Sequence, residues 1–232
     1  MKEGFYLAEE QNFKDNFNLY FQKNNLTQEE QEVKINRINK LKIEIESNNK
    51  ISTTFTTKNK GDLLEEYFNL VLDLNNKLIS YSKNVRTLDN EIDFVIDLKK
   101  VAKILRSQEI IPKYIPDHFL VECKNYNAVL GVTYINKFHS LLKIKDYNLG
   151  IFIAFNGITG EKEKGWFAGF GLIKKINLLS FHTDDFPLIC YADKKRLFSL
   201  ENILKESDYD LFDWIDNLRE ETKLDVFKDF EF

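Results

Sequence analysis

This sequence has few cysteines, no long apolar run and no secretory signal pattern. Its 232 residues include two cysteines, Cys123 and Cys190, too few for the framework of a disulfide-rich secreted protein. Nowhere do about 18 apolar residues follow one another, so no segment reads as a membrane-spanning helix. Residues 1–4 lack the charged-then-apolar pattern of a secretory signal. We therefore expect a cytoplasmic protein whose two thiols are reduced, buried and inert.

Several patterns of known chemistry are also missing. The sequence contains no P-loop, no G-x-G-x-x-G fingerprint, no zinc-spaced Cys/His cluster and no internal repeat. Its three histidines, His118, His139 and His182, fit no metal or nucleophile spacing, and ordinary polar roles are the better interpretation. The standard patterns for nucleotide binding and for zinc therefore do not apply to this chain.

The chain also lacks a net positive charge, because an excess of acidic side chains is concentrated near the C-terminus. Residues 201–232 hold eleven acidic side chains against four basic ones, a net charge of −7. The preceding 200 residues carry +3, which gives the total of −4. Nucleic-acid binding requires only a local basic surface, since a few Lys and Arg neutralise the phosphates. The net charge therefore neither favours nor excludes a nucleic-acid partner.

The most informative stretch is residues 119–124, an apolar run that ends in a Glu and a Lys separated by one residue. Turn-forming residues bound it, which predicts a short buried strand. Side chains alternate across a strand, so Leu120, Glu122 and Lys124 should share one face. Burying these charges is unfavourable unless they are paired or bind a metal. This strand is therefore the first candidate for chemistry.

A second predicted strand, residues 91–98, combines an apolar face with an acidic one. Ile92, Phe94, Ile96 and Leu98 alternate with Glu91, Asp93, Val95 and Asp97. If the two strands pair, Asp93 approaches Glu122 closely enough to share a divalent cation. Mg²⁺ prefers one or two carboxylates together with waters and phosphate oxygens. Asp93 and Glu122 are therefore the predicted metal ligands, with Lys124 beside the attacking water, while Glu91 is a weaker candidate.

Asp93 followed by Glu122-x-Lys124 resembles the D…(D/E)-x-K motif of the PD-(D/E)XK nuclease superfamily. Further segments follow in the order of its restriction-endonuclease-like and Mrr-like members: residues 60–66, similar to a G-x-x-(F/L)-E helix, then 84–93, 121–126 and 150–160. The resemblance covers roughly residues 55–195, and the ordered set is more specific than any single motif. The sequence departs from the pattern in two ways. Ile92 stands in place of proline, and the long gap from Asp93 to Glu122 implies an insertion.

The resemblance implies a Mg²⁺-dependent endonuclease that hydrolyses phosphodiester bonds in DNA, in restriction or defence against foreign DNA, with Mn²⁺ as a substitute metal. It implies Asp93, Glu122 and the carbonyl of Cys123 as metal ligands. Lys124 would orient the nucleophile and offset negative charge on the phosphorane. Glu65 would hold a water or complete a second metal site. The structural alternative for Glu65 is that an acid in the first helical turn favours the helix dipole.

Other functions stay open on sequence grounds. The chain could be a catalytically inactive nuclease-fold module that binds nucleic acid or assembles with a partner, although Asp93, Glu122 and Lys124 are all present, which favours the enzyme. The motifs do not distinguish DNA from RNA as substrate. The recognised sequence, any dependence on methylation, and the oligomeric state, including a homodimer, are equally open.

The remaining periodicity predicts an α/β fold with a mixed central sheet flanked by helices. We expect an N-terminal helical extension over residues 1–50 and a nuclease-like domain over 51–232 that ends in an acidic helix. Helices are expected over 8–24, 27–47, 62–75, 99–111, 131–145, 163–176, 200–205 and 208–222, and strands over 78–86, 91–98, 119–124, 150–155 and 186–191. The second helix begins with a capping box at residues 27–30, and either packs onto the core or pairs with a second subunit. The helix over 99–111 is basic and either contacts phosphates or presents a solvated face.

Overall fold

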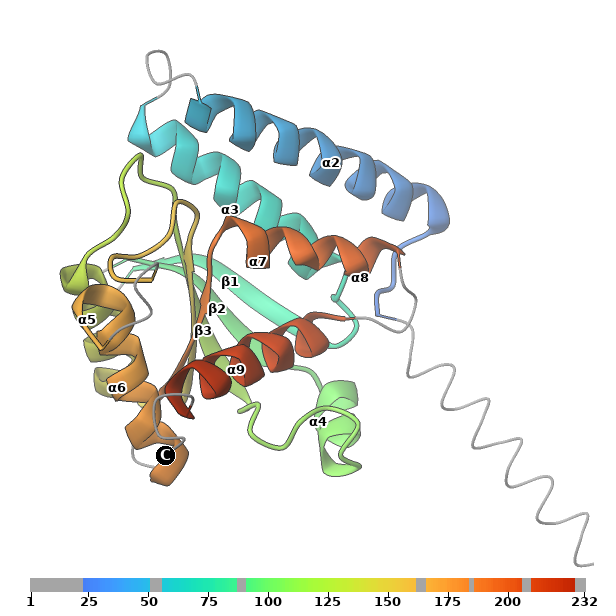
Figure 1. The fold of residues 1–232 in the computed structure, drawn as a ribbon. Coiled ribbons are helices and arrows are strands. Elements are labelled where there is room, and N and C mark those ends of the chain that lie inside the picture. Colours follow the sequence, from blue (N-terminus) through green and yellow to red (C-terminus); the bar gives the residue numbers. More distant parts are fainter. Residues whose placement is uncertain are drawn as a thin grey trace, which may run out of the picture.

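The computed structural model describes residues 23–50, 56–86, 91–161, 166–183, 186–205 and 210–227 (Figure 1). Within them, five strands form one sheet in the order β1-β2-β3-β4-β5. They are β1 (Ile79–Arg86), β2 (Glu91–Leu98), β3 (His118–Lys124), β4 (Leu149–Ala154) and β5 (Leu188–Ala192). The first three strands pair antiparallel, whereas β3, β4 and β5 pair parallel. The predicted α/β fold with a mixed sheet is confirmed.

Helices cover both sides of this sheet. They are α2 (Gln28–Lys50), α3 (Thr57–Asp73), α4 (Lys100–Ser107), α5 (Val132–Ile144), α6 (Ala168–His182), α7 (Lys194–Phe198), α8 (Asn202–Lys205) and α9 (Leu211–Phe227), with a 3₁₀ turn, η1, at Ser199–Glu201. Parallel neighbours require a crossover connection, and α5 and α6 provide the two crossovers here. No helix in the described ranges is long and apolar enough to cross a membrane.

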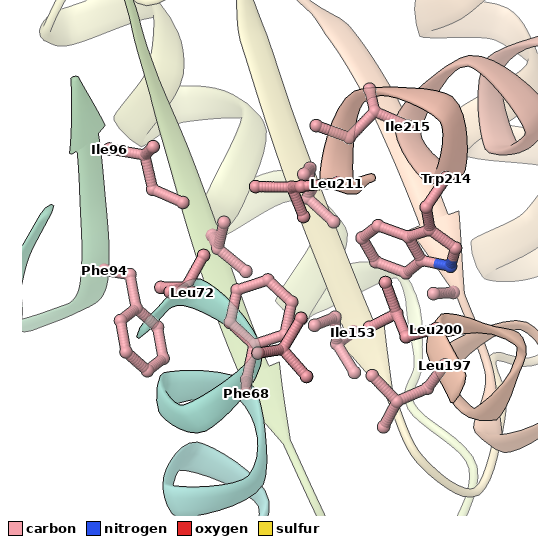
Figure 2. Packing of buried hydrophobic residues seen from close by; sticks show 14 of the residues in the cluster. Phe68, Leu72, Phe94, Ile96, Ile153, Leu197, Leu200, Leu211, Trp214 and Ile215 are labelled. Carbon is pink, nitrogen blue, oxygen red and sulfur yellow. The ribbon is translucent and has the colours of Figure 1, made fainter. Parts of the chain in front are cut away.

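Each face of the sheet has its own hydrophobic core. On one face, α3 and α9 pack against the sheet, and Figure 2 shows Phe68 of α3 between Phe94 of β2 and Trp214 of α9. The Phe68 ring lies 5.5 Å from the Phe94 ring and 6.2 Å from the Trp214 ring, measured between centroids. On the other face, α5 and α6 pack against β3, β4 and β5. Because β4 and β5 are buried on both faces, their sequences are continuously apolar.

The long helix α2 lies along α3 (Figure 1). Its buried residues Ile38, Leu41 and Ile45 belong to the same core as those of α3, so packing onto the core is the arrangement observed. The predicted capping box is present: Glu30 Oε2 accepts from the Thr27 N–H at 2.8 Å, and Thr27 Oγ1 accepts from the Glu30 N–H at 3.2 Å. The domain boundary at residue 51 stays a prediction.

One expected element, the helix predicted over 8–24, falls largely outside the described residues. The first residues of the helices predicted from 163 and 208 lie outside them too. The corresponding helices, α6 and α9, begin only at residues 168 and 211, since residues 166, 167 and 210 are described and not helical, and they end six and five residues later than predicted. Gly171 lies in the first turn of α6, where a Cβ would lie 2.0 Å from the Trp166 carbonyl carbon, and Gly160 ahead of the helix has a φ of +84°.

Two helix boundaries differ from prediction for identifiable reasons. The helix α3 begins at residue 57, not 62, because the side chain of Thr56 caps it by accepting from the Asn59 N–H. The helix α4 ends at residue 107, not 111, and Glu109 follows with a left-handed φ of 63°. In α4, Lys103 and Arg106 both form ion pairs with Asp117. Two of the cations considered for phosphate contact are therefore already paired.

Candidate active site

The site begins where the pairing of β2 with β3 stops. Phe94 opposite Val121 is the last registered pair toward this end of the two strands. Beyond it, the Asp93 side chain replaces the ladder: its Oδ2 accepts the Cys123 N–H at 2.7 Å. Asp93 is only 6% exposed, so this bond fixes a buried carboxylate beside the end of β3. The predicted approach of the two motif segments is therefore observed.

Strict alternation of faces fails at this point of β2. Phe94 and Ile96 belong to the core under α3 and α9, whereas Ile92 packs with Leu120 in the core under α5. The prediction that Ile92 shares a face with Phe94 is wrong. Since helices bury both faces of the sheet, apolar residues suit either side, and their pattern in the sequence does not reveal which face each one takes. Along β3 the predicted alternation holds, so Glu122 and Lys124 project on the α5 side with Leu120.

Lys124 lies between the two acids. Its Nζ is 2.6 Å from Glu122 Oε1 and 3.3 Å from Asp93 Oδ2. Burial by itself would lower the pKa of Lys124, but the carboxylates of Glu122 and Asp93 outweigh burial and raise it. The ammonium group therefore stays charged near neutral pH. In the absence of another cation, it balances much of the negative charge at this end of β3.

Glu122 lies in an unfavourable environment for a carboxylate. Burial, assisted by the negative charge of Asp93, raises its pKa to about 7 despite the opposing effect of Lys124. Its second oxygen, Oε2, is buried and has no hydrogen-bond partner within the described residues. A buried acceptor without a partner is destabilising. This oxygen is therefore directed at a position that suits a cation or a donor.

Glu65, on α3, faces the same group of charges. Burial raises its pKa to about 7, with Asp93 raising it further and Lys83 and Lys124 opposing. Because α3 begins at Thr57, Glu65 lies in the third helical turn, where the helix dipole acts weakly. The structural alternative for Glu65 therefore loses its basis.

The neighbouring acid on α3 points elsewhere. Glu66 receives two bonds from Arg37 of α2: Nε to Oε1 at 2.8 Å and Nη2 to Oε2 at 3.1 Å. This bidentate pair commits the Glu66 carboxylate to the α2–α3 interface. Of two adjacent acids, one is thus bound between helices and the other lies near Asp93 and Lys124. The pairing of Glu66 could not be predicted from α3 alone, because it depends on the position of α2.

The residues present fit a divalent metal in part. No three His, Cys, Asp or Glu side chains gather closely enough to form a metal cage within the described ranges. Asp93 and Glu122 nevertheless supply the one or two carboxylates that Mg²⁺ uses when waters and phosphate oxygens complete its shell. The unpartnered Glu122 Oε2 suits this role. The Cys123 N–H points to β2, and since the N–H and C=O of one strand residue point to the same side, its carbonyl does too.

Sequence reasoning missed one connection behind the site. Lys60 is 1% exposed, and its Nζ donates to Asn127 Oδ1 at 2.6 Å. Its backbone carbonyl accepts from Asn125 Nδ2 at 3.0 Å. These bonds tie the start of α3 to the loop that directly follows Lys124. No signal in the sequence separates this lysine from its solvated neighbours.

Comparison with known proteins gives one match. Residues 66–175, a little under half of the chain, match the family model described as a restriction endonuclease, the Mrr catalytic domain. The matched segment contains Asp93, Glu122 and Lys124 and begins immediately after Glu65. No curated protein matches the chain, and neither does any solved structure.

Proposed function

Residues 66–175 are a restriction-endonuclease domain of the PD-(D/E)XK superfamily, and on this premise we propose that the protein is a Mg²⁺-dependent endonuclease that cleaves DNA. The observation that carries the proposal is the convergence of Asp93, Glu122 and Lys124 at one strand end, with Lys124 Nζ within 3.3 Å of both carboxylates. The family also supports a role in restriction or defence against foreign DNA.

Each residue has a distinct task in this proposal. Asp93 and Glu122 would hold the metal through their carboxylates, together with the backbone carbonyl of Cys123. When bound, Mg²⁺ stabilises the negative charge of the phosphoryl group and makes a water molecule more acidic. The Cys123 N–H holds Asp93 in place, so the carboxylate does not have to reorient during the reaction.

Lys124 and Glu65 would act on the reacting groups directly. The raised pKa of Lys124 keeps it protonated, so it donates hydrogen bonds, orients the attacking water and offsets the charge that develops on the phosphorane. Glu65, with a pKa of about 7, is suited to hold a water molecule and to accept its proton near neutral pH.

Incubation of the purified protein with supercoiled, linear and methylated DNA, with and without Mg²⁺, tests the proposal. We expect supercoiled DNA to become nicked and then linear only when Mg²⁺ or Mn²⁺ is present. A parallel incubation with RNA of the same sequence shows whether the protein cleaves DNA, RNA or both. A folded protein that binds DNA but cuts none of these substrates with either metal would instead be an inactive nuclease-fold module.

A further inference from the structure

A pocket of about 180 Å³ opens beside Glu122 and Lys124, on the sheet face that α5 covers. Its inner part contains the buried rings of Phe138 and Phe152, whose centroids are 5.4 Å apart. The pocket does not include Asp93 or Glu65 among its lining residues. It is therefore a compartment next to the proposed metal ligands, distinct from the space between them.

Two tyrosines line the more exposed part of this pocket. Tyr126 follows Lys124 by two residues, and Tyr134 lies in the first turn of α5. Their ring centroids are 5.5 Å apart, and the rings are tilted by 46°, so neither is stacked parallel on the other. Tyr134 is 36% exposed. Lys137, one helical turn after Tyr134, also lines the pocket and adds a positive charge, while Glu91 at the start of β2 adds a negative one.

The size and lining select one kind of ligand. Pockets that hold drug-sized molecules measure about 300–1,000 Å³, so this one accommodates a single small ring system. Aromatic walls suit a flat ring, the lysine suits a neighbouring phosphate or a base oxygen, and the position beside Lys124 places such a ring one step from the proposed site of cleavage. A nucleobase attached to the reacting strand combines these properties.

We propose that the pocket binds one unstacked nucleobase adjacent to the phosphodiester held at Asp93, Glu122 and Lys124. The proposal rests on the proposed function and narrows its substrate class. A paired base must leave the duplex before it can enter, which is unfavourable and least so for a mismatched or single-stranded base. The preferred substrate is therefore DNA that carries an unpaired nucleotide beside the cleaved bond, not uniform duplex.

The test compares two substrates of identical length, a fully paired duplex and the same duplex with a short unpaired bubble. We expect the wild-type protein to cleave the bubble substrate at least about tenfold faster than the paired duplex. Tyr134→Ala should slow cleavage of the bubble by about the same factor and leave the rate on the duplex unchanged. A change of about tenfold is in the range expected for the loss of one base stacked on an aromatic ring. Tyr134→Phe, which keeps the ring, should behave as wild type. Val132→Ala is the matched control, because Val132 is an exposed residue of the same helical turn and does not line the pocket.

A second measurement separates this proposal from the proposed function. Fluorescence anisotropy in Ca²⁺ gives the affinity for each labelled substrate without requiring cleavage. Tighter binding of the bubble that depends on Tyr134, in a protein that cuts nothing, would support the pocket and contradict the nuclease. Cleavage of both substrates at equal rates, or an equal loss on both in Tyr134→Ala, would overturn the pocket and leave the nuclease standing.

Discussion

Asp93 Oδ2 accepts both the backbone N–H of Cys123, at 2.7 Å, and the Nζ of Lys124, at 3.3 Å. One oxygen of one buried side chain thus joins β2 to the backbone of Cys123 and to the side chain of Lys124 at the end of β3. An asparagine has nearly the same shape and can keep an acceptor oxygen for the Cys123 N–H, but it lacks the charge. The two contributions of Asp93, its hydrogen bond and its negative charge, can therefore be separated by one substitution.

We expect Asp93→Asn to melt at no lower a temperature than wild type in EDTA. Its free energy of unfolding should be higher by on the order of 1 kcal/mol, because the substitution relieves charge repulsion. The charge of Asp93 disfavours ionised Glu65 and Glu122, which offsets its attraction for Lys124. Millimolar Mg²⁺ should stabilise wild type by mass action and the variant much less. Thermal melts of both proteins in the two buffers provide the measurement. If Asp93→Asn lowered the melting temperature in EDTA by many degrees, Asp93 would be a structural acid and the metal site would lie elsewhere.

The strand β3, which carries the proposed site residues Glu122 and Lys124, was the most predictable part of the fold. In β3, a Glu and a Lys end an apolar run, and the face they occupy follows from simple alternation. The partner strand β2 was predictable in extent but not in facing, since both of its sides are buried. An apolar residue indicates which face of a strand it occupies only where the other face meets water, whereas the charged Glu122 and Lys124 mark their own face of β3.

Contacts between distant segments could not be predicted from the sequence. The burial of Lys60 depends on Asn125 and Asn127, which lie more than sixty residues away along the chain. The pocket depends equally on where α5 rests on the sheet. A Cβ at Gly150 of β4 would lie 2.7 Å from the Phe138 ring, so this close approach needs a glycine. Local patterns do not encode such distances.

Substitutions of the two adjacent acids of α3 should have unequal effects on cleavage. Glu65→Gln should reduce the rate strongly, because Glu65 lies near Asp93 and Lys124. Glu66→Gln should cut DNA at nearly the wild-type rate and lose less than about 1 kcal/mol of stability, the usual contribution of a partly exposed ion pair such as Arg37–Glu66. Rates on supercoiled DNA and melting temperatures check both variants. Equal losses of activity would mean that Glu65 does not act at the site.

The raised pKa values predict how stability without metal varies with pH. Burial raises the pKa of Glu65 and of Glu122 from 4.5 to about 7, so the folded protein binds protons that the unfolded chain has already released. The associated stability is fully present below pH 4.5 and is lost as the pH rises through about 7. In EDTA, wild type should therefore lose more stability than Glu65→Gln between about pH 5 and about pH 7.5. If the two proteins lost equal stability over this pH range, Glu65 would lie in an ordinary solvated environment.

Lys124 is the residue whose proposed role in cleavage can be tested most directly. Lys124→Ala removes the only group in the trio of Asp93, Glu122 and Lys124 that can donate to the attacking water and the phosphorane. The substitution also leaves Asp93 and Glu122, the proposed metal ligands, in place, so calorimetry should show that the variant still binds metal. Lys113→Ala is the matched control, since Lys113 is an exposed lysine whose ion pair, with Glu109, is itself exposed.

The decisive measurement is the rate of Mg²⁺-dependent cleavage of supercoiled DNA by wild type, Lys124→Ala and Lys113→Ala, each first shown to be folded. Loss of a positioned cation at the transition state predicts a rate at least about a hundredfold lower for Lys124→Ala and an unchanged rate for Lys113→Ala. Cleavage by Lys124→Ala within a few fold of wild type would contradict the assignment of Asp93, Glu122 and Lys124 as the catalytic centre.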